Sequence, residues 1–230
     1  MHRLDKYKES DSMSYLIGDN YRILLVMSRF GIGLGLGDKT IDEVCRENKV
    51  DTKTFLVIVN MLLDEDGVFD YSKAEISIES LLFYLHNSHD YFLDFRLPAI
   101  RKDLVDILDN QQGELSQAVI HYFDEYVSEV RKHMMYEEKT VFPYVRALLR
   151  GEADKNYNIN IFRRQHDQVE ARLHEFKNIL IKYYPAKSTN ELNSLLFDIF
   201  NCESDLASHN AIEDRLFVPV ITEYEQKLTK

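Results

Sequence analysis

Apolar residues recur at helical spacing from residue 77 to the end of the chain. They return every three or four positions, which is the pattern of a helix that buries one face. Breaks in the pattern divide this stretch into four long helices, expected at residues 77–108, 115–149, 159–184 and 190–228. Long helices with short connections favour an all-α, up-down four-helix bundle. Three of the helices contain a proline, where we expect a kink or a break, at Pro98, Pro143 and Pro219.

The chain before residue 73 contains only shorter helical stretches, expected at residues 21–30, 40–47 and 52–64, with Asp51 as the cap of the last. Four of the eight glycines lie in the sequence GIGLGLG, from Gly31 to Gly37. This spacing differs from a dinucleotide-binding fingerprint, so we expect a flexible turn there and no phosphate site. We predict a small helical domain over residues 1–72 and the bundle over residues 78–230.

Histidines and glutamates interrupt the apolar stripes of the four long helices. The apolar stripes of the first and third helices are each interrupted by one histidine, and those of the other two by a His-x-x-x-Glu pair: His89, His166, His133 with Glu137, and His209 with Glu213. Residues four apart are separated by about 40° around a helix, so both members of a pair point inward. Buried imidazoles and carboxylates need partners, and a metal centre satisfies all of them together.

The two His-x-x-x-Glu pairs lie in segments that read alike. HMMYEEKTVFP begins at His133 and HNAIEDRLFVP begins at His209, each with a proline ten residues after its histidine. This repetition indicates a bundle of two similar halves, each supplying one single histidine and one pair. Four imidazoles and two carboxylates suit two metal ions bridged by the two glutamates. The same ligands could hold iron, manganese or zinc.

Other histidines compete for a place in this centre. His86 and His89 are neighbours, but His89 lies mid-stripe and is the preferred ligand, which leaves His86 as an outer or gating residue. His121 and Glu125 repeat the pair spacing, yet His121 is rotated by about 120° from the inward side that His133 occupies. We therefore expect no site at His121.

Two further glutamates flank the proposed ligands by one helical turn. Glu129 precedes His133, and Glu170 follows His166. Each is a candidate base, proton relay or additional ligand, or else a solvated side chain. His174 falls off the centre of its stripe and is expected to meet solvent.

Charge and composition narrow the classes of function. The net charge is -11 and the isoelectric point about 5.2, which disfavours binding to nucleic acid or to an anionic membrane surface. No apolar run approaches the roughly 18 residues of a membrane span, and the charged first ten residues predict no signal peptide. The only cysteines, Cys45 and Cys202, form no cluster and fit a reducing cytosol. We expect a cytoplasmic protein.

Residues 78–228 resemble the haemerythrin-like cation-binding (HHE) domain. HMMYEE (residues 133–138), QHD (165–167) and HNAIE (209–213) make the chain most similar to the Repair of Iron Centres family. Its members are di-iron proteins linked to nitric-oxide and oxidative damage of iron–sulfur clusters. The resemblance implies two non-haem iron ions as the cofactor. Haemerythrin proper has a fifth histidine where this chain has Glu170, which disfavours a simple oxygen carrier.

The sequence RFGIGLGLGDKTIDEVC, from Arg29 to Cys45, resembles the small helical domain of the same family. Members usually carry a Cys-Cys pair beside the glycines, and this chain has no cysteine between Gly31 and Gly37. Cys45 matches a later cysteine of the pattern, but it is equally well explained as a packed thiol.

Three functions stay open on this basis. The first is a stress protein that helps to restore damaged iron–sulfur clusters, with those clusters' proteins as partners. The second is an enzyme that reduces nitric oxide or peroxide at the di-iron centre. The third is a module that binds or senses oxygen or nitric oxide. In each, the N-terminal domain could serve for docking or for homodimer formation.

Overall fold

The computed structural model describes residues 7–64, 75–108, 113–152, 156–164, 167–184 and 189–228, with no side chains described for residues 163, 164 and 167–170. Within these residues the chain is helical, with one isolated β-bridge between Ser12 and Thr40 and no strand. The predicted all-α class is confirmed. By contacts, the chain divides into a first unit, Met1–Ser88 with Ala211–Lys230, and a second unit, His89–Asn210. The predicted boundary between residues 72 and 78 stays a prediction.

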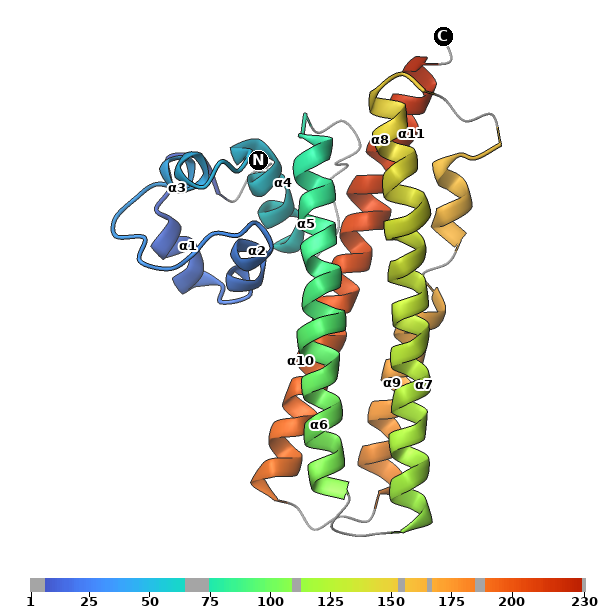
Figure 1. Cartoon of the computed structure of the whole chain (residues 1–230). Coiled ribbons are helices and arrows are strands. Elements are labelled where there is room, and N and C mark those ends of the chain that lie inside the picture. The colour runs from blue at the N-terminus through green and yellow to red at the C-terminus, as the bar shows by residue number, and fades with distance from the viewer. Residues whose placement is uncertain are drawn as a thin grey trace. The chain divides into compact units, whose positions relative to one another are not determined.

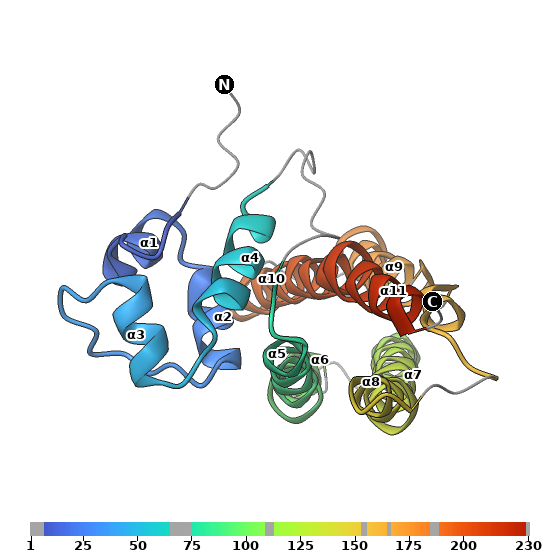
Figure 2. The ribbon, with the colours of Figure 1, turned by 90° about the horizontal axis from the view of Figure 1, so that it is seen from above.

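The second unit is a helical bundle built on one apolar core (Figures 1 and 2). Its main helices are α6 (Leu97–Leu108), α7 (Glu114–Tyr136), α9 (Asp167–Tyr183) and α10 (Asn190–Ile212). Each supplies buried residues three or four positions apart, as an inward stripe requires. Among them are Leu97, Ile100 and Leu104 from α6, Val119, Phe123 and Tyr126 from α7, Leu173, Phe176 and Leu180 from α9, and Leu195, Ile199 and Cys202 from α10.

The third predicted helix differs at its start. We expected one α-helix from residue 159, but a 3-10 helix, η4 (Ile159–Arg164), comes first and α9 begins at Asp167. The amide N–H of Asn160 donates to Oδ1 of Asn158, 3.1 Å away. This local bond satisfies a backbone donor in the tighter turn, since asparagine side chains compete with regular helical pairing.

Helices continue through all three prolines, so none of the prolines breaks its helix, and the kinks stay a prediction. A π-helical turn precedes each proline: η1 (Tyr91–Arg96), η3 (Glu137–Val141) and η5 (Glu213–Phe217). The following α-helices are α6, α8 (Phe142–Leu149) and α11 (Val218–Leu228), with proline as their second residue. Proline lacks an N–H and clashes with the carbonyl four residues earlier. The wide turn avoids this, because the carbonyl of Glu137, for example, accepts instead from the N–H of Phe142, five residues on.

The first unit contains the N-terminal helices, α1 (Met13–Asp19), α2 (Ile23–Arg29), α3 (Ile41–Glu47) and α4 (Thr52–Leu62), together with most of α5 (Ile78–Asp90) and with α11. We had not predicted α1. The predicted cap is present, because the Asp51 side chain accepts from the N–H of Thr54. GIGLGLG forms an irregular loop, as expected, and its left-handed backbone at Gly31, Gly35 and Gly37 (φ 72°, 90° and 59°) suits glycine.

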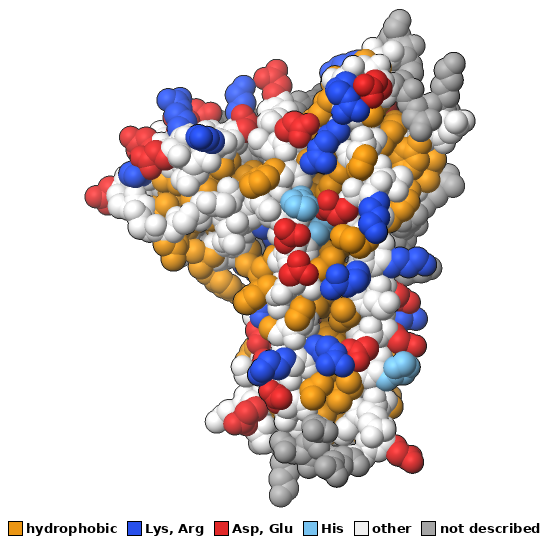
Figure 3. All heavy atoms as spheres, viewed as in Figure 1, with side chains coloured by type: hydrophobic (Ala, Val, Ile, Leu, Met, Phe, Trp, Pro, Cys, Tyr) orange, Lys and Arg blue, Asp and Glu red, His pale blue; other side chains and the backbone are white. Residues whose placement is uncertain are grey.

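Acidic and basic side chains are interspersed with apolar ones on the face shown in Figure 3. The second unit contains a bidentate ion pair between Arg101 and Asp124, with nitrogen–oxygen distances of 2.6 and 2.9 Å. Exposed pairs of this kind contribute at most about 1 kcal/mol. Stability therefore comes mainly from the apolar cores.

Candidate metal centre

Four of the predicted ligands lie at helix ends or in π turns. His89 lies in the last turn of α5 and His209 in the last turn of α10. Glu137 and Glu213 are the first residues of η3 and η5. Functional sites often coincide with π turns, because the wider turn changes which side chains face inward.

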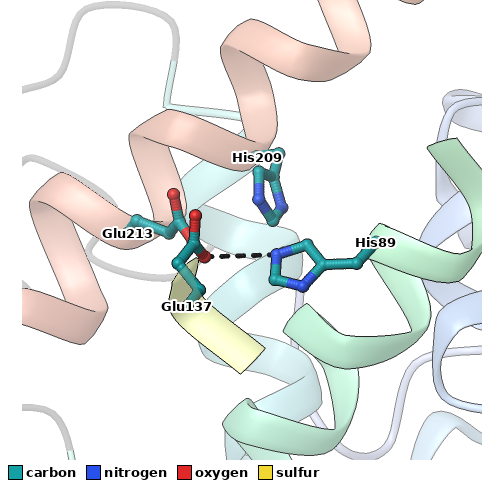
Figure 4. A group of neighbouring side chains, drawn as sticks. All are labelled: His89, Glu137, His209 and Glu213. Atoms are coloured by element: carbon teal, nitrogen blue, oxygen red, sulfur yellow. Dashed lines mark ion pairs between the residues drawn. The ribbon is translucent and has the colours of Figure 1, made fainter. Parts of the chain in front are cut away.

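Four of the six predicted ligands lie together (Figure 4). One ligand atom from each of His89, Glu137, His209 and Glu213 lies within 4.8 Å of those of the other three. All four side chains are buried, with at most 1% of their surface exposed. In Figure 4 the two carboxylates lie side by side, and the two imidazoles face them. The sequence pattern therefore located residues that meet in space.

Glu137 contacts two histidines through two different oxygens. Its Oε2 lies 3.2 Å from Nε2 of His89, and its Oε1 lies 3.1 Å from Nε2 of His133. His133 is thus a fifth predicted ligand at the same place, although it is slightly exposed, at 10% of its side chain. A carboxylate with an imidazole at each oxygen has the arrangement of a bridge between two metal ions.

A carboxylate on the neighbouring helix orients the His89 ring. Oε1 of Glu138 lies 2.7 Å from Nδ1 of His89, the ring nitrogen opposite the one that faces Glu137. Ligand histidines in metalloproteins usually make such an outer bond, which fixes the ring and its tautomer. We had assigned no role to Glu138. Its position directly after Glu137 was the only sequence signal, and its partner is 49 residues away.

Two phenylalanines stack on the imidazoles. The ring of Phe142 lies parallel to that of His89, with centroids 5.5 Å apart and planes inclined by 4°. Phe162 lies similarly against His133, at 6.2 Å and 13°. These flat contacts limit rotation of both imidazoles and keep the surroundings apolar.

The other candidates lie elsewhere. His86 is exposed. His121 and His174 are 76% and 64% exposed and lie beside Glu125 and Glu203, in agreement with the expectations that His121 points away from the inward side and that His174 meets solvent. Glu129 is partly exposed, at 43% of its side chain, and its Oε1 lies 2.8 Å from the Arg172 guanidinium, which favours the solvated interpretation. His166 and the side chain of Glu170 lie outside the described residues.

The donor set fits a divalent cation. Two buried carboxylates bring two negative charges into the core, and such charges are costly without compensation. A metal ion supplies positive charge where the oxygens and imidazole nitrogens converge. Imidazole and carboxylate suit iron, manganese and zinc alike, so the donors alone leave the choice among these metals open.

Comparison with known families agrees with this geometry. The model of the Hemerythrin HHE cation binding domain matches residues 80–221, which is more than half of the chain. The protein belongs to this family, and it is accordingly a metal-binding, haemerythrin-like helical bundle. A search of curated proteins found no match. Among the described residues, no helix is long and apolar enough to cross a membrane.

Proposed function

We propose that the protein holds two iron ions and helps to repair iron–sulfur clusters damaged by nitrosative or oxidative stress. His89, His133, His166 and His209 are the terminal ligands in this proposal, and Glu137 and Glu213 are the bridges. Repair proceeds by donation of iron, by handling of nitric oxide, or by both. Damaged iron–sulfur proteins in the cytoplasm are the proposed partners, and nitric oxide and oxygen the small ligands.

The contact of Glu137 with two histidines carries the proposal. A single metal ion needs only one oxygen from this carboxylate, whereas here each oxygen faces its own imidazole, at 3.2 and 3.1 Å. Glu213 occupies the equivalent position in the second pair and lies beside Glu137. Two carboxylates placed in this way support a pair of ions better than a single ion.

The chain's own residues give such a centre two useful properties. Glu138 and Phe142 fix the His89 ring, so this ligand is oriented before iron arrives. Imidazole and carboxylate hold ferrous iron less tightly than an all-thiolate cage would, which favours release to a client. The iron pair, when bound, supplies reversible redox chemistry and positions for small ligands.

The assignment to cluster repair rests on the motifs that resemble the Repair of Iron Centres family. These are HMMYEE, QHD and HNAIE in the bundle, and the glycine-rich sequence that ends at Cys45. Glu170 at the place of haemerythrin's fifth histidine disfavours a simple oxygen carrier. We therefore rank repair above oxygen storage.

The test begins with protein purified anaerobically, with iron content and visible spectrum measured before and after air oxidation. We expect about two irons per chain and a di-ferric absorption band. Incubation with a cluster-depleted iron–sulfur protein, sulfide and a chelator competitor then measures transfer of iron. Restored clusters support repair. Absence of iron from the purified protein would sink the di-iron proposal.

The same preparation separates the alternatives. Sustained consumption of nitric oxide or peroxide with a reductant, without iron transfer, would replace repair by a reductase. A stable adduct that forms and dissociates with oxygen pressure would indicate a carrier or a sensor. Loading with manganese or zinc in place of iron would change the metal and leave the ligand set intact.

A further inference from the structure

The N-terminal segment, defined here as residues 7–64, is attached to α5 just ahead of His89. Nδ2 of Asn87 donates to the backbone carbonyl of Arg29, 2.7 Å away. The guanidinium of Arg29 donates to the hydroxyl of Tyr84 at 3.3 Å, and Phe30 packs on the Tyr84 ring with centroids 5.2 Å apart. Arg29 and Tyr84 are both buried, so these contacts form a packed joint inside the first unit.

The contacts at this joint lie on a different side of α5 from His89. Tyr84 and His89 are five residues apart, which places them about 140° apart around the helix. The N-terminal segment therefore holds α5 from a side that His89 does not use. It can fix the helix without competing for the ligand position.

A second joint lies beside the other proposed bridge. Oδ2 of Asp64 lies 3.0 Å from the guanidinium of Arg215, which is two residues after Glu213 in η5. The Asp64 side chain is only 6% exposed. The Arg215 side chain is 34% exposed, so water reaches one end of the pair, while the carboxylate end is held inside the first unit. The end of the N-terminal segment is thus tied to the turn that presents Glu213.

Both joints connect one segment to chain positions within two residues of a proposed ligand. Asn87 precedes His89 by two residues, and Arg215 follows Glu213 by two. We propose that the N-terminal segment governs retention of the metal, with Arg29 and Asp64 as positioning residues that hold His89 and Glu213 in place. This inference rests on the metal centre proposed above and adds a role for residues 7–64: docked, the segment retains iron, and loosened, it permits release.

The test measures the anaerobic rate at which a ferrous chelator removes iron from the loaded full chain. Asp64→Asn keeps the shape and removes the charge, and we expect removal about tenfold faster, the lower end of the effect of altering residues that orient ligands. Asn87→Ala, at the other joint, should act in the same direction. Asp64→Glu should restore the slow rate. Adding Arg215→Gln to Asp64→Asn should add little, since the two residues share one contact.

Two controls separate positioning from general destabilisation. Glu47→Gln removes an exposed ion pair with Lys39 in the same segment and should leave iron removal unchanged. Ile58→Val removes a buried methyl group from the core of the segment and leaves both joints in place; it should lower the unfolding midpoint and leave the rate of removal near that of the unsubstituted protein.

The outcomes are distinguishable from failure of the metal proposal. An unsubstituted protein that binds two irons, with Asp64→Asn and Asn87→Ala releasing them at its rate, would overturn the retention role alone. Release that tracks the unfolding midpoint across all variants, Ile58→Val included, would also overturn it. An unsubstituted protein without iron would overturn the proposed centre and this inference together.

Discussion

The segments that begin at His133 and at His209 share one local structure. In each, the glutamate four residues after the histidine opens a π turn, and proline follows as the second residue of the next α-helix. The two copies thus present their glutamates in the same way, next to each other in the core. The two similar eleven-residue sequences therefore fold alike, each as a π turn followed by an α-helix.

The contacts made just after the two glutamates differ. In the first, Glu138 follows the glutamate and bonds to the His89 ring, so the support comes from within the second unit. In the second, Arg215 follows two residues after the glutamate and pairs with Asp64 of the N-terminal segment. The comparison teaches that the two glutamates are presented in the same way, while the contact described beside each of them runs to a different part of the chain.

The largest expected effect is loss of metal on substitution of a bridge. Glu137→Ala removes both oxygens that face His89 and His133, and we expect iron to fall from about two per chain to well below one. Glu213→Ala should fall as far if the two copies are equivalent. Metal analysis and the visible band provide the measurement.

Glu125→Ala is the matched control, because His121 and Glu125 have the same spacing on the surface. Its iron content should equal that of the unsubstituted protein. A Glu137→Ala protein that keeps both irons would show that the buried cluster is only a polar core network.

The next effect in size is at the support of the first copy. Glu138→Gln keeps the side chain's size and removes the charge that Nδ1 of His89 meets, so we expect metal affinity to fall about 10- to 100-fold. Chelator competition measures this. Glu129→Gln is the control, since Glu129 pairs with Arg172 at the surface. Equal affinities for both variants would contradict the orienting role of Glu138.

The spacing of apolar residues predicted the long helices and brought out five of the proposed ligands, because both can be recognised from neighbouring positions in the sequence. A histidine or glutamate in an apolar stripe must be buried wherever the stripe is buried. The π turns were not predictable from Pro143 alone, since packing decides whether a helix breaks, kinks or widens. The Asp64–Arg215 pair joins residues 151 apart, and no local pattern encodes such a contact. His166 lies outside the described residues, so its place stays a prediction.

A smaller effect distinguishes packing from metal support. Phe142 and Phe123 are both fully buried, and Phe→Leu at either should cost about 1 kcal/mol of unfolding free energy. Of these two phenylalanines, Phe142 is the one that stacks on a proposed ligand, His89. We expect Phe142→Leu alone to shift the visible band and to weaken metal binding a few-fold, as measured by denaturation and by chelator competition. A band unchanged in both variants would limit Phe142 to a packing role.

The smallest effect is expected at Cys45. The reactivity of its thiol tests whether the N-terminal segment contributes thiol chemistry or only packing contacts. Burial raises the pKa of the Cys45 thiol to about 12. At pH 8 roughly one molecule in ten thousand then carries the reactive thiolate. We expect Cys45 of the native protein to react with a disulfide reagent only as fast as local unfolding of the segment exposes the thiol. The Cys45→Ala protein should keep its iron content and its rate of iron release. Rapid labelling of Cys45 at pH 8 would contradict the burial of its thiol and would favour a thiol function for the N-terminal segment beside its contacts.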